Sequence, residues 1–333
     1  MSFVFYDVPL AGDGLLHPAV AEDYPTPPNW GVHGDLSAAR RRMDVPWGRD
    51  LTPPGAVQWE QRPAAGSLPP LRLYRAADAP ERAPCLLFFH GGGFYGGSAA
   101  AVHHPCLYLA WRLGGVVVNV DYPLAPEHPY PQALEACAAV LERVRGEAER
   151  WGVDPGAVSL AGDSAGGNLA LCLALRTLDR GEPAPAALGL IYPVLQVGEL
   201  LTPGTEYDAD SFAVPPGHPQ AAIALGLART IADVREEMEG LYLAGGAGAA
   251  RYRSPLLEPL PRTLPPVFLA AAEFDSLRRE DERFARRLEG EGFSGEYRLY
   301  RGVPHAFMDA LGRYPQAEDC LSALAAFLQR AIS

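Results

Sequence analysis

The sequence predicts an α/β fold in which a mostly parallel central sheet carries helices on both faces. Short continuous apolar runs recur along the chain, such as CLLFF at 85–89 and VFLAAA at 267–272, and such runs form strands that are buried on both faces. Helical segments separate these runs, and this alternation is typical of a doubly wound sheet. With 333 residues, 48% of them hydrophobic, the chain can bury the core of one large domain.

Local patterns predict the individual elements. Within residues 1–54, which are rich in proline, glycine and tryptophan, only 36–43 has a helical pattern. Residues 56–62 and 71–75 alternate apolar and polar side chains, as exposed antiparallel strands do. Buried strands are expected at 85–89, 115–120, 157–161, 188–192 and 267–272, with a last strand at 296–300. Helices are expected at 131–152, 165–181, 278–292 and 317–333.

Residues 197–254 interrupt the alternation. They carry no strand pattern and contain two stretches that each predict a short helix, PPGHPQAAIALGLART and VREEMEGLYLAGG. We predict that residues 1–54 and this insertion form a helical cap over the carboxyl ends of the strands, where such folds bind ligands. Residues 55–196 and 255–333 then form the core. Six apolar side chains either line a pocket under the cap or form the cap's own core: Trp30, Trp47, Phe212, Leu225, Leu241 and Tyr242.

Composition argues against several classes of partner. A formal net charge of −12 repels phosphate backbones and anionic lipids, so nucleic acid is not expected to bind. No apolar run reaches the roughly 18 residues of a membrane span, and the N-terminus does not resemble a signal peptide. Five scattered cysteines without a CxxC spacing predict free thiols in a cytoplasmic protein. His103 and His104 lack a third ligand at a suitable spacing, so no metal or cofactor is expected.

A G-x-S-x-G pattern surrounds Ser164 in the sequence Gly162-Asp163-Ser164-Ala165-Gly166. A predicted strand precedes it and a predicted helix follows, and a sharp turn between them would hold the serine hydroxyl above the sheet edge. The helix N-terminus would offer N–H groups, including that of Ala165, to a developing oxyanion. This context favours a nucleophilic serine over an ordinary glycine-rich turn.

A serine nucleophile needs a base and an acid, which follow it in the order acid, then histidine, in this type of fold. Only His218 and His305 follow Ser164; His218 lies in the expected cap, whereas His305 follows the last predicted strand. After the strand at 267–272 the preferred acid is Asp275, because it lies farther out on the loop than Glu273. Asp309 ranks third because it follows the histidine.

The stretch HGGGF at 90–94 follows the predicted strand at 85–89. Three consecutive glycines let backbone N–H groups approach a substrate carbonyl closely, and the pattern matches the HGGG type of oxyanion hole. A phosphate cradle is the alternative, but the G-x-x-x-x-G-K-[ST] pattern and its lysine are missing.

Five stretches together resemble the bacterial branch of the hormone-sensitive-lipase-like carboxylesterases: HGGGF (90–94), DYPLAPEHPYPQA (121–133), GDSAGGNLA (162–170), EFDSLRRE (273–280) and VPHAF (303–307). The resemblance implies an α/β-hydrolase fold, with Ser164 as nucleophile, Asp275 as orienting acid and His305 as base. It implies oxyanion donors at Gly91, Gly92 and Ala165. It also implies that a small-molecule ester of short to medium acyl length is cleaved through an acyl-enzyme, and that the chain forms a homodimer through its last strand and C-terminal helix.

Two other functions stay open at this point. An amide hydrolase, for example a deacetylase, would use the same triad on the same fold. A ligand-binding receptor of this fold is a third reading, although such a protein is expected to have lost a member of the triad, and Ser164, Asp275 and His305 are all present.

Overall fold

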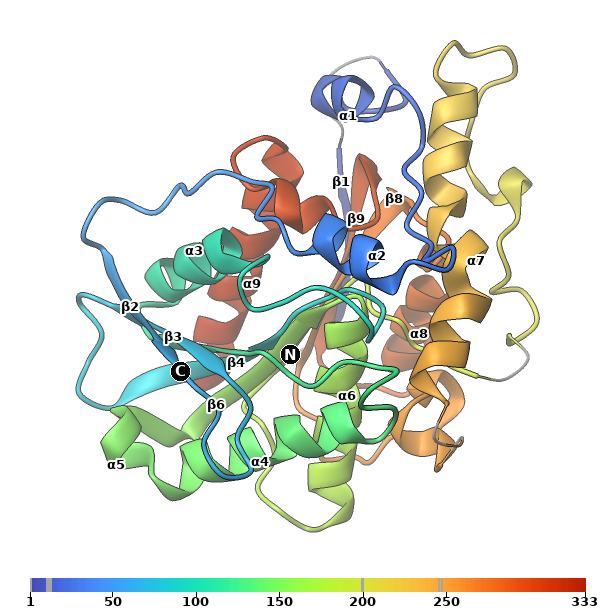
Figure 1. The fold of residues 1–333 in the computed structure, drawn as a ribbon. Coiled ribbons are helices and arrows are strands. Elements are labelled where there is room, and N and C mark those ends of the chain that lie inside the picture. The colour runs from blue at the N-terminus through green and yellow to red at the C-terminus, as the bar shows by residue number, and fades with distance from the viewer. Residues whose placement is uncertain (1, 10–13, 199–200, 245, 247) are drawn as a thin grey trace.

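The computed structural model describes residues 2–9, 14–198, 201–244, 246 and 248–333, which form a nine-stranded sheet in the order β1-β9-β8-β7-β6-β4-β5-β3-β2 (Figure 1). In this spatial order, the first seven strands, which end with β5, are all parallel to their neighbours. Strand β3 pairs antiparallel with β5, and β2 pairs antiparallel with β3. The strands are β1 (Phe3–Val8), β2 (Val57–Arg62), β3 (Leu71–Ala76), β4 (Ala83–Phe89), β5 (Val116–Val120), β6 (Val153–Asp163), β7 (Leu188–Ile191), β8 (Val267–Phe274) and β9 (Gly295–Pro304).

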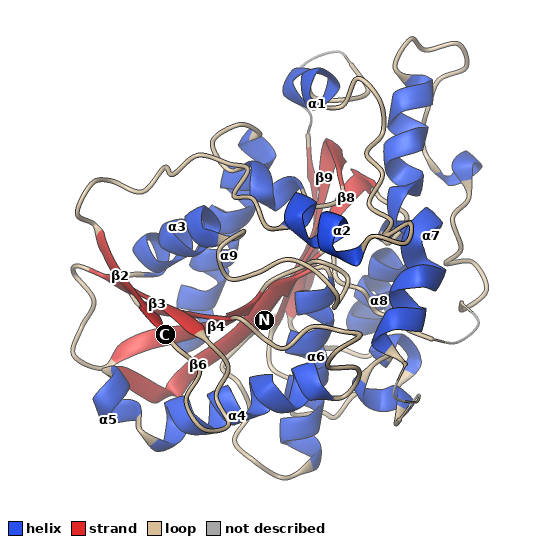
Figure 2. Cartoon of the chain, in the orientation of Figure 1, coloured by secondary structure: helices blue, strands red, loops and turns tan. Residues whose placement is uncertain are grey.

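Helices cover both faces of this sheet (Figure 2). They are α1 (Pro18–Asp23), α2 (Leu36–Met43), α3 (His103–Leu113), α4 (Gln132–Gly146), α5 (Ala148–Trp151), α6 (Ala165–Asp179), α7 (Ala221–Tyr242), α8 (Arg278–Gly290) and α9 (Pro315–Ile332). Short 3-10 turns are η1 (Ala209–Ser211), η2 (Ala250–Tyr252), η3 (Pro255–Leu257) and η4 (Phe307–Ala310).

Strand β4 shows how the two layers of core arise. Its side chains alternate between the two faces of the sheet. Leu86 and Phe88 belong to the apolar cluster that contains the buried residues of α3 and α9. Cys85, Leu87 and Phe89 belong to the cluster that contains those of α4, α6 and α8. Because the strand is buried on both faces, it appears in the sequence as a continuous apolar run. The predicted α/β fold is confirmed.

The parallel strands place four loops at one edge of the sheet. The glycines of HGGGF follow β4, Ser164 follows β6, Asp275 follows β8 and His305 follows β9. Carboxyl ends of parallel strands meet at the same edge, which is where such sheets bind ligands.

Several elements differ from the expectation. Helices α1 and α3 were not among the expected helices. Residues 3–8, where no strand was expected, form β1 and pair in parallel with β9. The two short helices expected in the insertion are one continuous helix, the 22-residue α7. The helix expected at 131–152 is divided into α4 and α5 at Glu147.

Parts of residues 14–56 and helix α7 lie against each other over this edge of the sheet (Figure 1). The backbone N–H of Val32 donates to Glu237 Oε2 of α7 at 2.8 Å, and that of Leu15 donates to Gln220 Oε1 at 2.9 Å. The two segments are therefore joined by hydrogen bonds as well as by packing. Within the described ranges, no helix combines the length and the apolar character needed to cross a bilayer.

Candidate active site

Ser164 lies in a strained turn between β6 and α6. Its backbone has φ 53° and ψ −117°, a region that costs a non-glycine residue free energy and is found mainly at functional sites. Glycines at either side are required: a Cβ on Gly166 would collide with the carbonyl oxygen of Phe89, and one on Gly162 would collide with Gly166. The N–H of Ser164 donates to the carbonyl of Ile191 at 2.9 Å. The tight turn therefore has a steric cause in this sequence.

The three residues predicted to act together are brought together. His305 Nε2 lies 2.9 Å from Ser164 Oγ, and His305 Nδ1 lies 2.6 Å from Asp275 Oδ2. The other oxygen of Asp275 accepts the N–H of Leu277 at 2.9 Å. All three side chains are buried. A carboxylate that holds Nδ1 fixes the orientation of the ring, so Nε2 faces the hydroxyl as a proton acceptor.

The lower-ranked candidates have other partners. Glu273 accepts the N–H of Gly302 at 2.8 Å and pairs with Arg301 at 2.8 Å, so it fastens β8 to β9. His218 Nδ1 accepts the N–H of Gln220 at 3.1 Å, just before α7.

The expectation for Gly91 does not fit the structure. Its N–H already donates to Asp163 Oδ1 at 2.9 Å, so it is not available to a substrate. In the described part of the chain, no hydrogen bond uses the backbone N–H of Gly92, Gly93 or Ala165. Gly93 was not among the expected donors, because the motif alone does not reveal which of its three N–H groups already has an acceptor within the protein.

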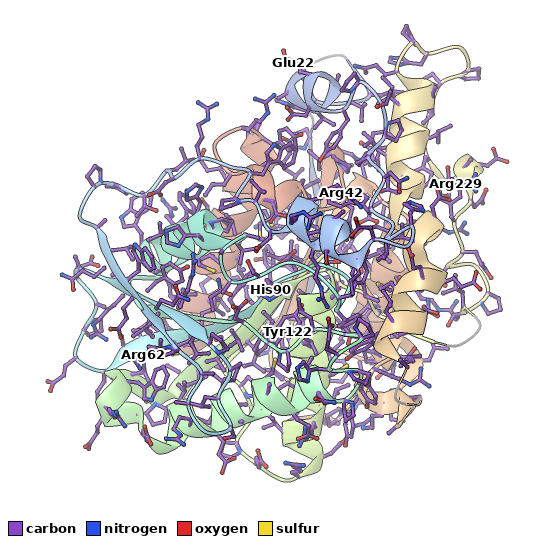
Figure 3. All side chains as sticks on the ribbon, in the orientation of Figure 1. Glu22, Arg42, Arg62, His90, Tyr122 and Arg229 are labelled. Atoms are coloured by element: carbon purple, nitrogen blue, oxygen red, sulfur yellow. The ribbon has the colours of Figure 1, made fainter. Side chains whose placement is uncertain are left out.

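His90 is the first residue of the loop after β4, and it packs against Tyr122, which follows β5 (both are labelled in Figure 3). Their rings stack with centroids 4.2 Å apart, and the Tyr122 hydroxyl donates to the carbonyl of His90 at 2.7 Å. Burial lowers the pKa of His90, which favours its neutral form. These two residues therefore act as a rigid support for the glycines.

A cavity of about 90 Å³ opens beside Ser164 and His305. Apolar and aromatic side chains from the chain before β2, the loops after β4 and β7, and α7 form much of its wall: Trp30, Met43, Tyr95, Val194, Ile231, Val234 and Met238. The sequence left open whether six apolar cap residues line a pocket or form a core. Trp30 lines the cavity as far as the structure describes it, whereas Phe212 and Tyr242 are buried in the two apolar clusters.

Two carboxyl groups also line this cavity, those of Asp163 and Asp309. Burial raises the pKa of Asp309 to about 7, against a lowering by the neighbouring His305. Burial, reinforced by Asp309, raises the pKa of Asp163 well above its usual range. Asp309 was considered from the sequence only as an alternative triad acid, and the structure places it in the cavity wall instead.

The paired histidines of α3 have separate partners. His103 Nδ1 lies 2.9 Å from the Tyr74 hydroxyl, and His104 Nδ1 lies 3.0 Å from the carbonyl of Gly48. Among the residues that the structure describes, no three His, Cys, Asp or Glu side chains form a group that could hold a metal ion. All five cysteines are buried and unpaired.

Comparisons with known proteins identify the family to which this chain belongs. A family model described as an alpha/beta hydrolase fold matches residues 86–309. The carboxylic ester hydrolase LipN of Mycobacterium tuberculosis is 33% identical over 276 residues, which cover 80% of this chain and 69% of that protein. The carboxylesterase NlhH of the same organism is 28% identical over 265 residues, covering 79% and 78%.

Among solved structures, the hyperthermophilic esterase of Pyrobaculum calidifontis is 30% identical with a TM-score of 0.73, covering 89% of this chain and 93% of that one. LipW of Mycobacterium marinum, also an esterase, is 31% identical with a TM-score of 0.66, covering 83% and 82%. The chain therefore belongs to the hormone-sensitive-lipase-like family of α/β hydrolases and is a hydrolytic enzyme of the carboxylesterase type.

Proposed function

We propose that this enzyme hydrolyses small carboxylic esters of short to medium acyl length through an acyl-enzyme on Ser164. One observation carries the proposal: the chain of hydrogen bonds from Asp275 through His305 to Ser164, which ends in a largely apolar cavity. A hydroxyl becomes a useful nucleophile when a correctly oriented base accepts its proton. Here His305 is the base, and Asp275 fixes the orientation of its ring.

In the first step His305 Nε2 accepts the proton of Ser164 while Oγ attacks the ester carbonyl. The N–H groups of Gly92, Gly93 and Ala165 hold the negative charge on the carbonyl oxygen, and loss of one such donor costs about 3–4 kcal/mol in other hydrolases. The tetrahedral intermediate then expels the alcohol, which takes the proton from His305. Water repeats the sequence on the acyl-enzyme and releases the carboxylic acid.

Short to medium acyl chains are supported by the size of the cavity, about 90 Å³, and by its walls of Trp30 and Met238. We further propose that the chain before β2, apart from β1, and the insertion that contains α7 act as a cap over the site. The hydrogen bond between Val32 and Glu237, at 2.8 Å, supports a joint action of the two segments.

The test is hydrolysis of p-nitrophenyl esters from acetate to laurate by the native enzyme and by Ser164→Ala. We expect the highest kcat/KM at short chains and a loss of at least about 10⁴-fold in the variant. Ser67→Ala, which changes an exposed serine between β2 and β3, is the matched control. Near-native turnover by a purified Ser164→Ala protein would contradict the proposal.

The triad alone does not separate esters from amides, so the same proteins are assayed on a matched ester and anilide. We expect the ester to have the higher kcat/KM, and a higher value for the anilide would assign the enzyme to amide hydrolysis instead. Tight ligand binding by folded enzyme, with turnover of neither substrate, would support the receptor reading.

A further inference from the structure

The catalytic cavity has an acidic side that the proposed mechanism does not use. Asp309, on η4, contributes a half-buried carboxyl group to the wall, and its Oδ1 is buried without a hydrogen-bond partner. No hydrogen bond or ion pair among the described residues reaches either oxygen of this carboxyl group. Asp163 adds a second carboxyl group, of which one oxygen accepts the N–H of Gly91 at 2.9 Å.

This arrangement favours a positively charged ligand. A carboxylate in an apolar cavity lacks the solvation it has in water, so a cation that enters the cavity gains more from it than it would at the protein surface. The described lining contains no arginine or lysine, and its partner for positive charge is His305, which lowers the pKa of Asp309 but makes no hydrogen bond to it. Trp30 and Tyr95 line the same cavity, and aromatic rings attract cations as well.

Several titratable groups surround Asp309. His305 lies four residues before it on the same loop, Asp163 comes from the end of β6, Tyr192 follows β7 and Tyr24 follows α1; each is coupled to it electrostatically. Burial raises the pKa of Asp309 to about 7 although His305 opposes the shift. The negative charge on this side of the cavity therefore increases as the pH rises through neutrality.

We propose that Asp309 makes the catalytic cavity selective for esters that carry a positive charge near the carbonyl group, on the acyl or the alcohol side. This inference rests on the proposed esterase function and names the substrate class of that site. Asp309 acts as a specificity determinant, because its charge contributes to the binding of cationic esters and not to the chemical step.

The experiment compares two pairs of esters that differ only in charge. In the first pair, acetylcholine is matched with the acetate whose tert-butyl group replaces the trimethylammonium group. In the second, the ethyl ester of a trimethylammonio-butanoic acid is matched with its tert-butyl isostere. The charge of a quaternary ammonium group does not change with pH. The catalytic residues act on both members of a pair in the same way, so the ratio of their kcat/KM values isolates the effect of the cavity's charge.

We expect this ratio to favour the cationic ester in the native enzyme for at least one pair, and to rise between about pH 6 and 8 as Asp309 ionises. In Asp309→Asn the ratio should fall about tenfold at pH 8 and lose its dependence on pH. Asp78→Asn removes the same charge from an exposed turn after β3 and should keep the native ratio.

A ratio that is equal in Asp309→Asn and native enzyme for both pairs overturns the inference, as does a native ratio that does not change with pH. The native pH series needs no variant, so a folding defect in Asp309→Asn does not leave the inference untested. Hydrolysis of the neutral esters reports separately on the esterase function: if the neutral and cationic esters all resist the folded native enzyme, the proposed function fails rather than the selectivity.

Discussion

Glu273 and Asp275 lie two residues apart at the end of β8, but their carboxylates have different partners. Asp275 contacts His305 at 2.6 Å, whereas Glu273 contacts the backbone of Gly302 and the side chain of Arg301. Strand β8 runs to Phe274, so Asp275 is the first residue beyond it. Because Asp275 lies one residue beyond the strand, its carboxylate extends past the edge of the sheet toward His305.

The first prediction separates the roles of these two acids. Asp275→Asn keeps the size of the side chain but removes the negative charge that orients and stabilises the imidazole, so kcat/KM should fall about 10³–10⁴-fold. Glu273→Gln keeps an acceptor for the N–H of Gly302 and should stay within about tenfold of native enzyme. Steady-state kinetics on p-nitrophenyl acetate measure both, and equal losses would contradict the assignment of Asp275.

The buried carboxyl group of Asp281 leads to a second prediction. Its side chain is fully buried on α8, and neither carboxyl oxygen has a hydrogen-bond partner. Burial, together with the carboxyl groups of Glu280, Asp275 and Glu282, raises its pKa well above the usual value. The folded protein therefore holds a proton that the unfolded chain releases above about pH 3.9, and Asp281 costs the fold stability as the pH rises from there.

The side chain of the Asp281→Asn variant cannot ionise, so the gain in folding stability over native protein should grow with pH. We expect the free energy of unfolding to exceed that of native protein by about 1–3 kcal/mol at pH 8 and by less at pH 5. Urea denaturation at the two pH values measures the difference. Exposed Asp78→Asn is the control, and a gain that is equal at both pH values would show that ionisation of Asp281 is not the cause.

Arg40 links helix α2 to the loops beside the site. Arg40 donates to the carbonyl oxygens of Tyr95 and Ala125 at 2.7 and 2.8 Å and pairs with Glu127 at 2.6 Å. Tyr95 belongs to the loop after β4, and Met43 at the end of α2 lines the cavity. The position of the cavity wall therefore depends on Arg40.

We expect Arg40→Ala to reduce the free energy of unfolding by about 2 kcal/mol, because two charge-assisted hydrogen bonds to carbonyls are lost. kcat/KM should fall about tenfold, mainly through a higher KM, as the wall loosens. Arg41→Ala on the same helix, an exposed residue, is the matched control. A loss in kcat alone would assign Arg40 to the chemistry rather than to the cavity.

The sequence predicted best those elements whose burial is visible in their own residues. Strands such as β4 and β8 are apolar along their length because both faces are covered. Strand β1 was missed because it is a half-exposed edge strand whose partner β9 lies at the other end of the chain. Helix α7 was expected in two pieces, but Ile231 and Val234, near the expected break, line the cavity, and that contact is tertiary.

The residues of the site also fall into those that the sequence predicts and those that only the tertiary structure reveals. Chain order and motif spacing led to Ser164, Asp275 and His305, which lie within hydrogen-bond distance of one another. The choice among the glycines depends on where the carboxylate of Asp163 points, since it takes the N–H of Gly91. The cavity wall combines residues far apart in the chain, such as Trp30 and Met238, which no local pattern connects.

At the scale of the whole molecule, β1 occupies the outer edge of β9. Phe5 packs on Tyr297 with ring centroids 5.6 Å apart, and Asp7 pairs with Arg301 at 2.7 Å. The homodimer implied by the family resemblance would use the last strand, and in this chain the free edge next to that strand belongs to β1. Dimerisation through this side of the sheet stays a prediction.

Removal of residues 1–8 should expose the hydrogen-bonding edge of β9. We expect the free energy of unfolding to fall by about 2–4 kcal/mol, from the lost burial of aromatic surface, and the truncated protein to self-associate through the bare edge. Denaturant titration and sedimentation velocity measure the two effects. Val4→Ala trims an exposed side chain but keeps the strand, and it should behave as native protein.

The pairing of β1 with β9 also has a consequence for synthesis on the ribosome. Strand β1 emerges long before its partner β9 is made, and the delay is about 15–60 s at ~5–20 residues per second. Asp275 and His305 come from the last two strands, so a nascent chain carries its serine long before it carries its base. Activity and the closure of this sheet edge therefore both wait for the synthesis of β9. Until then other proteins, or the rest of the nascent chain, must cover the aromatic segment FVFY at residues 3–6.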